Sequence, residues 1–134
     1  MILSKNKDSS LLYKNSKYVK ELSPKDFKVI GIDKQVMPKK YPVLIKFYAH
    51  WCPHCSNPGM HQFMEAIGES FPKKAGIQVA ALSCEHNEKN GDIARNIGIM
   101  GYPTFKYYNS RGEMSEYRGG PNPESLVKFL LEHS

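Results

Sequence analysis

Several features that would place this chain in a specialised class of protein are missing from its sequence. Its 134 residues include three cysteines and one tryptophan. No apolar run approaches the roughly 18 residues that a membrane-spanning helix needs. Three cysteines are too few for a small domain held together by disulfides. The length fits one domain, and no internal repeat is visible. We therefore expect a single globular domain with a continuous apolar core.

The N-terminal residues also lack the apolar stretch of a secretion signal. Residues 1–16 are polar and show no apolar periodicity, so they are predicted to form a flexible basic leader before a domain over residues 17–134. If Met1 is the natural start, the expected location is the cytoplasm or a virion. A secretory compartment is the alternative if a preceding segment has been removed.

Net charge is not spread evenly along the chain. The whole excess of +6 lies in residues 1–40, which hold ten lysines and four acidic residues, whereas residues 41–134 hold nine basic and nine acidic residues. One interpretation is a solvated lysine-rich surface. The other is a docking surface for an acidic partner, an anionic lipid or a nucleic acid.

Apolar periodicity indicates alternating strands and helices. Residues 42–49, PVLIKFYA, predict a buried central strand in which only Lys46 is out of place. An apolar stripe at helical spacing follows over residues 60–71, and residues 77–82 predict a second buried strand. Earlier in the chain, residues 18–22 suggest a short edge strand. A helix start is expected at Ser23-Pro24, and residues 27–37 fit either strand or one short helix.

The C-terminal third predicts antiparallel structure. Residues 88–97 are weakly helical, and residues 104–108 and 114–117 form a predicted hairpin. A last helix opens at Asn122-Pro123. This order predicts an α/β fold with a central mixed β-sheet flanked by helices on both faces. The expected buried face of the last helix consists of Leu126, Val127, Leu130 and Leu131.

A pair of cysteines lies where the predicted central strand passes into a helix, in the sequence Cys52-Pro53-His54-Cys55. Unpaired N–H groups and the helix dipole favour a thiolate in this first turn. We expect Cys52 to be the exposed attacking nucleophile and Cys55 to be shielded and to resolve a mixed disulfide. Pro53 suits the first helical position, and His54 could add a positive charge. A structural disulfide or half of a zinc site are the alternatives.

Two segments resemble a known family. Residues 43–55, VLIKFYAHWCPHC, resemble the active-site strand and turn of the thioredoxin superfamily, above all of protein disulfide isomerase domains. Residues 98–104, GIMGYPT, resemble the loop of that superfamily that ends in a cis-proline. The resemblance implies a thioredoxin fold, a cis Pro103 facing the cysteines, and a Tyr102 backbone that pairs with a substrate strand. Trp51 would then be either a packing residue or part of the substrate-binding surface, and an ordinary trans Pro103 is the alternative.

The resemblance implies a thiol–disulfide oxidoreductase that acts on cysteine-containing proteins, exchanges electrons with an unidentified donor or acceptor protein, and requires no cofactor. Pro53-His54 is similar to the pair in bacterial periplasmic disulfide oxidases, which favours an oxidase or isomerase over a reductase. The alternatives are a cytosolic thioredoxin-like reductase, a non-catalytic binding module and a zinc-stabilised module.

Lys46 departs from the pattern, because the superfamily usually has a buried acid at this position of the strand. Lys46 could lie beneath the cysteines and favour their thiolates, or it could reach the surface or pair with an acid. Arg118 is a weak substitute for the arginine that assists reoxidation in disulfide isomerases. Cys84 is expected to pack as a small apolar residue; the alternatives are a third redox thiol, or a zinc ligand together with Cys52, Cys55 and His86.

Overall fold

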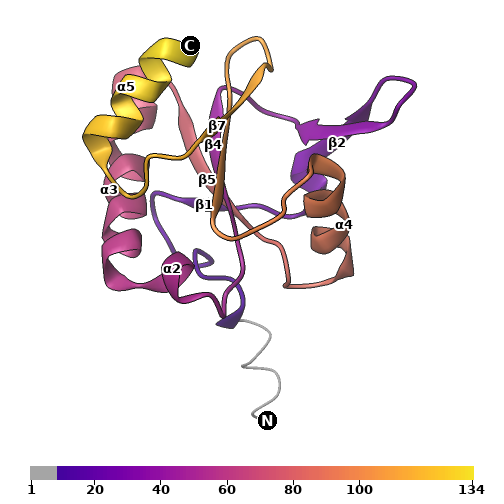
Figure 1. Cartoon of the computed structure of the whole chain (residues 1–134), viewed down its shortest axis with the longest axis horizontal. Helices are drawn as coiled ribbons and strands as arrows, with labels where there is room; N and C mark the ends of the chain where they lie inside the picture. The colour runs from indigo at the N-terminus through magenta and orange to yellow at the C-terminus, as the bar shows by residue number, and fades with distance from the viewer. Residues whose placement is uncertain (1–8) are drawn as a thin grey trace.

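The computed structural model describes residues 9–134, and a five-stranded mixed sheet forms the centre of this part (Figure 1). Strands β1, β5 and β4 run parallel, and β6 and β7 add antiparallel to β4. The predicted mixed sheet is therefore confirmed. In spatial order its strands are β1 (Lys20–Glu21), β5 (Gln78–Ser83), β4 (Val43–Tyr48), β6 (Thr104–Tyr108) and β7 (Met114–Tyr117).

Helices cover both faces of the sheet, as predicted. Helices α3 (Pro58–Ala75) and α5 (Pro123–His133) lie on one side of it in Figure 1, and α4 (Glu88–Ile97) lies on the other. The apolar core is accordingly split into two clusters. The first joins the sheet to α3 and α5, and the second joins it to α4 and to Phe27.

The central strand β4 has residues in both clusters, because successive side chains of a strand point to opposite faces. Val43, Ile45 and Phe47 belong to the cluster on the α4 side, whereas Leu44 and Tyr48 belong to the cluster on the α3 side. Every residue of the strand is buried. By this alternation Lys46 shares a face with Leu44 and Tyr48.

The ambiguous stretch 27–37 is resolved as a second, two-stranded sheet. Strands β2 (Phe27–Ile30) and β3 (Gln35–Pro38) pair antiparallel. The turn between them is closed by a hydrogen bond from the backbone N–H of Lys34 to the carbonyl oxygen of Gly31, 3.2 Å away. The helix start predicted at Ser23 is confirmed, although it opens only the short 3-10 helix η1 (Pro24–Asp26).

The helix after the cysteine pair is interrupted. A short helix α2 (Pro53–Ser56) ends at Asn57, whose side-chain oxygen accepts a hydrogen bond from the backbone N–H of Met60 at 2.8 Å and caps α3. Pro58 opens the new helix at a position where its missing N–H costs nothing. The predicted apolar stripe is confirmed over its first four members, since Met60, Phe63, Met64 and Ile67 are all buried.

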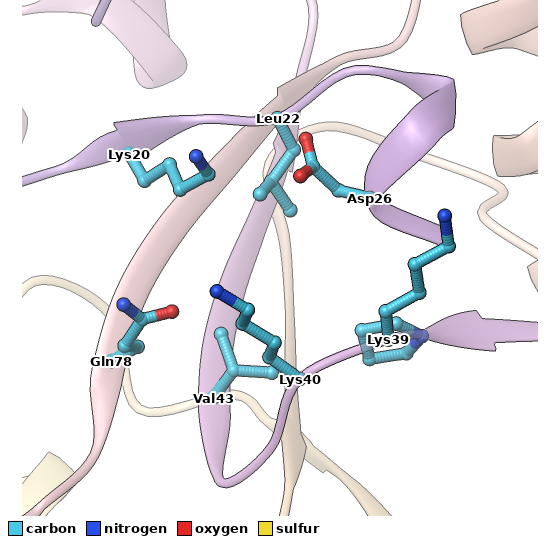
Figure 2. A pocket seen from close by; sticks show the side chains of 8 residues that line it. Lys20, Leu22, Asp26, Lys39, Lys40, Val43 and Gln78 are labelled. Carbon is cyan, nitrogen blue, oxygen red and sulfur yellow. The ribbon is translucent and has the colours of Figure 1, made fainter. Parts of the chain in front are cut away.

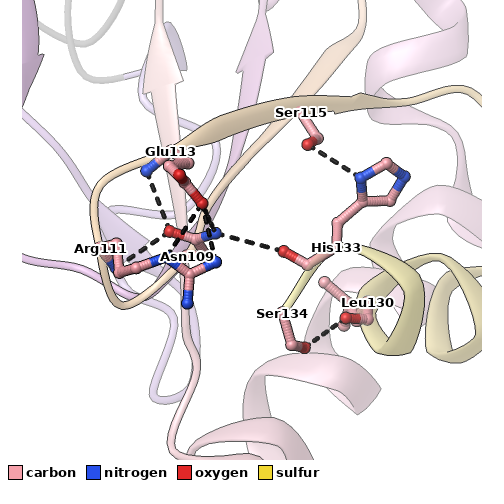
Figure 3. Close-up of polar contacts among 7 residues, drawn as sticks. All are labelled: Asn109, Arg111, Glu113, Ser115, Leu130, His133 and Ser134. Atoms are coloured by element: carbon pink, nitrogen blue, oxygen red, sulfur yellow. Dashed lines mark hydrogen bonds and ion pairs between the residues drawn. The ribbon is translucent and has the colours of Figure 1, made fainter.

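The predicted buried face of α5 is only half right. Leu126 and Leu130 are buried, whereas Val127 is 44% and Leu131 76% exposed. Helix α5 packs on the sheet along one narrow stripe, so two of the four residues predicted to be buried remain outside. Figure 3 shows how its end is attached to the β6–β7 hairpin: the Asn109 side chain donates to the carbonyl oxygen of His133 at 3.4 Å.

The expected leader is corrected over its second half. Residues 1–8 lie outside the described residues, but residues 9–16 lie against the domain. Tyr13 is only 2% exposed and belongs to the core cluster on the α3 side. The carbonyl oxygen of Ser10 accepts a hydrogen bond from the Ser83 side chain at 2.5 Å. Because this segment is polar overall, its sequence does not indicate that the aromatic side chain of Tyr13 is buried in the core.

Candidate functional site

The two cysteines lie on one turn of backbone at the end of β4. Cys52 is the N-cap residue of α2, and Pro53 occupies the first helical position. The carbonyl oxygen of Cys52 accepts hydrogen bonds from the Cys55 N–H at 3.0 Å and from the Ser56 hydroxyl at 3.0 Å. Both thiols are free. The cysteine pair therefore lies at the start of a helix, as the sequence predicted.

The expected exposure of Cys52 is wrong, because only 7% of the residue is exposed, against 1% of Cys55. The loop before β6 covers it. The Cys52 sulfur lies 3.8 Å from the carbonyl oxygen of Tyr102. The bond between Tyr102 and Pro103 is cis, which confirms that prediction. Of the two residues, Cys52 is still the more exposed.

Trp51 is a surface residue beside the pair. It is 59% exposed, and its indole N–H donates to a carboxylate oxygen of Glu85 at 2.7 Å. Its ring meets the Tyr102 ring edge to face, with 6.2 Å between the ring centres. A fixed and exposed aromatic surface therefore flanks Cys52. Sequence reasoning missed Glu85, an ordinary acid in a loop with no pattern to mark it.

A groove runs from the start of α2 to the loop after β7. His54 and Arg118 both line it, together with the cis Pro103. Both Pro53 and His54 are exposed. Arg118 donates to a carboxylate oxygen of Glu116 at 3.0 Å. The groove thus begins at the cysteine turn and carries a paired arginine along its wall.

Lys46 is fully buried beneath the pair, at 0% exposure. Its ammonium group donates to the phenolic oxygen of Tyr13 at 2.7 Å and to the carbonyl oxygen of Cys55 at 2.5 Å. The alternative in which this side chain reaches the surface is therefore wrong. Within residues 9–134, no carboxylate forms an ion pair with it.

Burial has opposite effects on the two groups that meet here. It lowers the pKa of Lys46 to about 8, although the neighbouring Cys55 and Glu21 charges oppose this change. Burial also raises the pKa of the Cys55 thiol to about 11, while the positive charge of Lys46 acts in the other direction. Desolvation penalises whichever form is charged, so it moves an amine down and a thiol up.

A half-buried acid, Glu21 on β1, completes the polar cluster. One of its oxygens accepts hydrogen bonds from the Tyr48 hydroxyl at 2.7 Å and from the Tyr13 backbone N–H at 2.9 Å. Burial raises the pKa of Glu21 to about 6. Sequence reasoning missed Tyr13 and Glu21 as neighbours of the site. The one available signal was Lys46 itself, since a lysine inside an apolar strand requires polar partners.

Cys84 lies just beyond β5 and is 2% exposed. Its sulfur lies 3.6 Å from the carbonyl oxygen of Leu82, and burial raises the pKa of its thiol to about 12. The expected packing role agrees with this burial. The ring of His86 instead faces the Ser10 hydroxyl, 2.5 Å away. Nowhere in residues 9–134 do three or more potential metal ligands gather.

Part of the basic N-terminal region forms a pocket far from the cysteines. Figure 2 shows Lys20, Lys39 and Lys40 lining this pocket together with Asp26. Val43, at the start of β4, lines the same pocket, so it lies at the opposite end of that strand from the cysteine turn. An acidic partner at this surface stays a prediction. In the described part of the chain, no helix is long and apolar enough to cross a membrane.

The geometry agrees with the comparisons to known proteins. Residues 14–132 match the thioredoxin family. The chain is 33% identical over 115 residues to the protein disulfide-isomerase tigA of Aspergillus niger, covering 85% of this chain and 30% of that protein. It is 31% identical to the protein disulfide isomerase-like 2-2 of Oryza sativa subsp. japonica, covering 81% of this chain and 29% of that protein. The chain thus spans less than a third of the length of these two relatives.

Solved structures support the fold. The J-Trx1 fragment of ERdj5 superposes with a TM-score of 0.67 at 20% identity, over 90% of this chain and 52% of that fragment. Mitochondrial thioredoxin 3 of Saccharomyces cerevisiae gives a TM-score of 0.52 at 23% identity, over 67% of this chain and 76% of that protein. The sheet order, the cysteine turn at the start of a helix and the facing cis-proline are thus accounted for together: this chain belongs to the thioredoxin family.

Proposed function

We propose that this domain is a thiol–disulfide oxidoreductase that acts on protein cysteines. The observation that carries the proposal is the position of the Cys52 sulfur, at the start of a helix and 3.8 Å from the Tyr102 carbonyl oxygen. Cys55 follows on the same turn. Cys52 is the nucleophile in this proposal, because it is the less buried of the two.

The exchange proceeds through a mixed disulfide. When the pair donates its disulfide, a substrate thiolate attacks the Cys52 sulfur, the Cys52–Cys55 bond breaks, and Cys55 takes the electron pair. A second substrate thiolate then attacks the substrate sulfur of the mixed disulfide and releases Cys52 as a thiolate. The substrate has lost two electrons and gained a disulfide. When the pair is the reductant, the same steps run backwards, and Cys55 resolves the mixed disulfide.

The surroundings of Cys52 suit an extended polypeptide substrate. The Tyr102 backbone borders the sulfur, and Trp51 offers an exposed aromatic surface beside it. Backbone groups that pair with a peptide contribute affinity without reading its sequence, whereas an aromatic ring adds apolar contact. A cysteine-containing protein is therefore the proposed substrate. A second protein that restores the redox state of the pair is the proposed partner.

We favour disulfide donation or isomerisation over reduction. A stabilised thiolate favours the reduced pair, and this makes the disulfide a better oxidant. Pro53 and His54 between the cysteines support this direction, and so does the similarity to protein disulfide isomerases. Protein disulfides persist in oxidising surroundings. The proposal therefore favours a virion or a secretory compartment over a reducing cytoplasm as the place of action.

Equilibration of the full chain in glutathione buffers of graded ratio tests this proposal. The Cys52–Cys55 disulfide is quantified by mass spectrometry after acid quenching and alkylation. A reduction potential of about −120 to −180 mV is expected for a disulfide donor or isomerase. A potential of about −270 mV, like that of thioredoxin, would make the protein a reductase. If no intramolecular disulfide forms at any ratio, the exchange proposal is wrong and a binding role replaces it.

A further inference from the structure

Lys46 lies in a row of residues that crosses the sheet beneath the cysteine turn. In the strand register Glu21 pairs with Ala81, and Ala81 pairs with Lys46. Side chains at paired positions point to the same face of a sheet. The row therefore places one acid and one base on the α3 side, separated by a single small residue.

The environment of Lys46 favours its charged form over a neutral amine. Hydrogen bonds from an ammonium group are stronger than those from an amine, and both of its partners, Tyr13 and the Cys55 backbone, accept through oxygen. The ammonium nitrogen also lies 5.0 Å from the centre of the Tyr13 ring and 5.4 Å from that of Tyr48. Aromatic faces attract cations at such distances. These contacts partly offset the cost of burying the charge.

One of those contacts ties the charge directly to the cysteine turn. The carbonyl oxygen that accepts from Lys46 belongs to Cys55, so the ammonium group cannot shift without disturbing the turn. No carboxylate in residues 9–134 forms an ion pair with Lys46. The charge of Glu21 acts on Lys46 without an ion pair, and a thiolate on the pair adds a second negative charge that stabilises the ammonium group.

We propose that Lys46 is a positioning residue for the cysteine pair, whose ammonium group, held by Tyr13 and by the Cys55 carbonyl, stabilises the reduced pair as a thiolate and strengthens its disulfide as an oxidant. This inference rests on the proposed exchange reaction. Reduction of the disulfide delivers two electrons to the pair and leaves one sulfur as an anion near Lys46. Oxidation removes that anion, so the buried ammonium group loses the thiolate and keeps only the opposing charge of Glu21, which disfavours the disulfide.

The same charge assists the resolving step. In the mixed disulfide Cys52 carries no charge, and Cys55 must lose its proton to solvent before it can attack. Burial raises the pKa of Cys55 to about 11, and Lys46 acts against that rise. The Cys55 thiolate then attacks the Cys52 sulfur, the bond between Cys52 and the substrate breaks, and the substrate sulfur leaves as a thiolate. Lys46 itself forms no covalent bond in any of these steps.

The effect must depend on pH, because burial lowers the pKa of Lys46 to about 8. Below that value the ammonium group is present, and above it the neutral amine no longer stabilises a thiolate. Other ionisable side chains face the cluster, so a variant that changes only Lys46 is needed to isolate its contribution. These groups are Cys52 and Cys55 on the α2 turn, Glu21 on β1, Tyr48 on β4, Tyr13 before the sheet, and His61 and Glu65 on α3.

The test compares equilibrium constants for oxidation of the pair by glutathione disulfide at pH 7 and at pH 9.5. Lys46→Met keeps the length of the side chain and removes its charge. Its pair should be oxidised at pH 7 with an equilibrium constant about tenfold higher than that of the wild type, the effect of one unit of thiol pKa. At pH 9.5 the ratio should fall below about threefold, since the wild type has also lost the charge there.

Two further variants make the result specific. Tyr13→Phe removes only the hydroxyl group that accepts from Lys46, and it should change the constant in the same direction by a smaller factor. Lys106→Met is the matched control: Lys106 is also largely buried, on β6, but its ammonium group bonds to Glu116 at 3.2 Å. We expect its constant to stay within twofold of the wild-type value.

Three results would overturn the inference. Equal constants for Lys46→Met and the wild type at pH 7 would remove the electrostatic role. If the ratio of the constants for Lys46→Met and the wild type is the same at pH 9.5 as at pH 7, Lys46 is only a packing residue. Should Lys46→Met fail to fold, an unchanged constant for Tyr13→Phe would count against the inference. A wild-type chain that forms no disulfide at any ratio would instead overturn the proposed exchange reaction itself.

Discussion

The sulfur of Cys52 and the carbonyl oxygen of Tyr102 are 3.8 Å apart although fifty residues of sequence separate them. This contact joins the cysteine turn to the loop that enters β6. It also explains why a nucleophile expected at the surface is almost covered. A substrate must therefore approach the Cys52 sulfur past Trp51 and the loop that holds Tyr102.

Trp51→Ala is expected to weaken substrate binding more than folding. The indole is 59% exposed, and its contacts with Glu85 and Tyr102 are peripheral. Its removal should change the free energy of unfolding by less than about 1 kcal/mol. The KM for a cysteine-containing peptide should rise about tenfold, equivalent to about 1.4 kcal/mol, with kcat little changed. Equal KM values for the two proteins would exclude the indole from the substrate surface.

Cys84 is expected to be chemically inert in the folded protein. It is 2% exposed, and burial raises the pKa of its thiol to about 12, so almost no thiolate exists at pH 7. Iodoacetamide should modify Cys52 first and Cys84 only after unfolding, as followed by peptide mass spectrometry. Cys84→Ala should keep full exchange activity. Early labelling of Cys84 would support the alternative of a third redox thiol.

Two leucines of α5 offer a matched test of the packing. Leu126 is 0% exposed, whereas Leu131, five residues later, is 76% exposed. Leu126→Ala should lower the free energy of unfolding by about 2–5 kcal/mol, because it leaves a cavity in the core. Leu131→Ala should stay within about 0.5 kcal/mol of the wild type. Urea unfolding of both variants measures the difference, and similar losses would mean that α5 packs in another orientation.

Lys46 should give the stability of the protein a defined pH dependence. Burial lowers its pKa to about 8 from an ordinary value of 10.5. Between these values the unfolded chain binds a proton that the folded chain does not, so this contribution to stability rises with pH over that window. Below pH 8 the cost of the buried charge is complete. Relative to the wild type, Lys46→Met should be most stable below pH 8 and lose that advantage towards pH 10.5.

Denaturant unfolding of both proteins at several pH values provides the measurement. The hydrogen bonds that Lys46→Met removes add an offset that does not vary across this window. Both proteins are unfolded with the Cys52–Cys55 disulfide formed, because Lys46 itself acts on the pKa of the Cys55 thiol and the titration of a free thiol would differ between them. A difference that is constant from pH 7 to 10.5 would contradict the altered pKa of Lys46.

The sequence was sufficient for the elements whose signal is local. The apolar run of β4 and the cysteine turn after it were predictable, because each rests on the residue types within a few positions. The cis bond before Pro103 was predictable only through the family resemblance. The hairpin of β2 and β3 stayed ambiguous because its apolar residues alternate poorly and several remain exposed at its tip.

What escaped prediction depends on contacts between distant segments. Tyr13 lies in a polar stretch that gives no sign of burial, yet its hydroxyl accepts from Lys46, 33 residues later. Glu21 is likewise ordinary in sequence, and it lies in the same row as Lys46 only because β1 pairs with β5 beside β4. Lys46 indicated that polar partners were required, but only the assembled sheet identifies them. The coverage of Cys52 by the Tyr102 loop escaped notice for the same reason.

The most direct test of the central claim is to trap the mixed disulfide with single-cysteine variants of the pair. A peptide that carries an activated disulfide is mixed with Cys55→Ser and with Cys52→Ser at pH 7, and the adducts are mapped by mass spectrometry. Cys55→Ser should hold a stable adduct on Cys52, whereas Cys52→Ser should react far more slowly. The wild type should release the peptide as Cys55 closes the disulfide. Faster adduct formation on Cys55 than on Cys52, or a stable adduct on the wild type, would contradict the account.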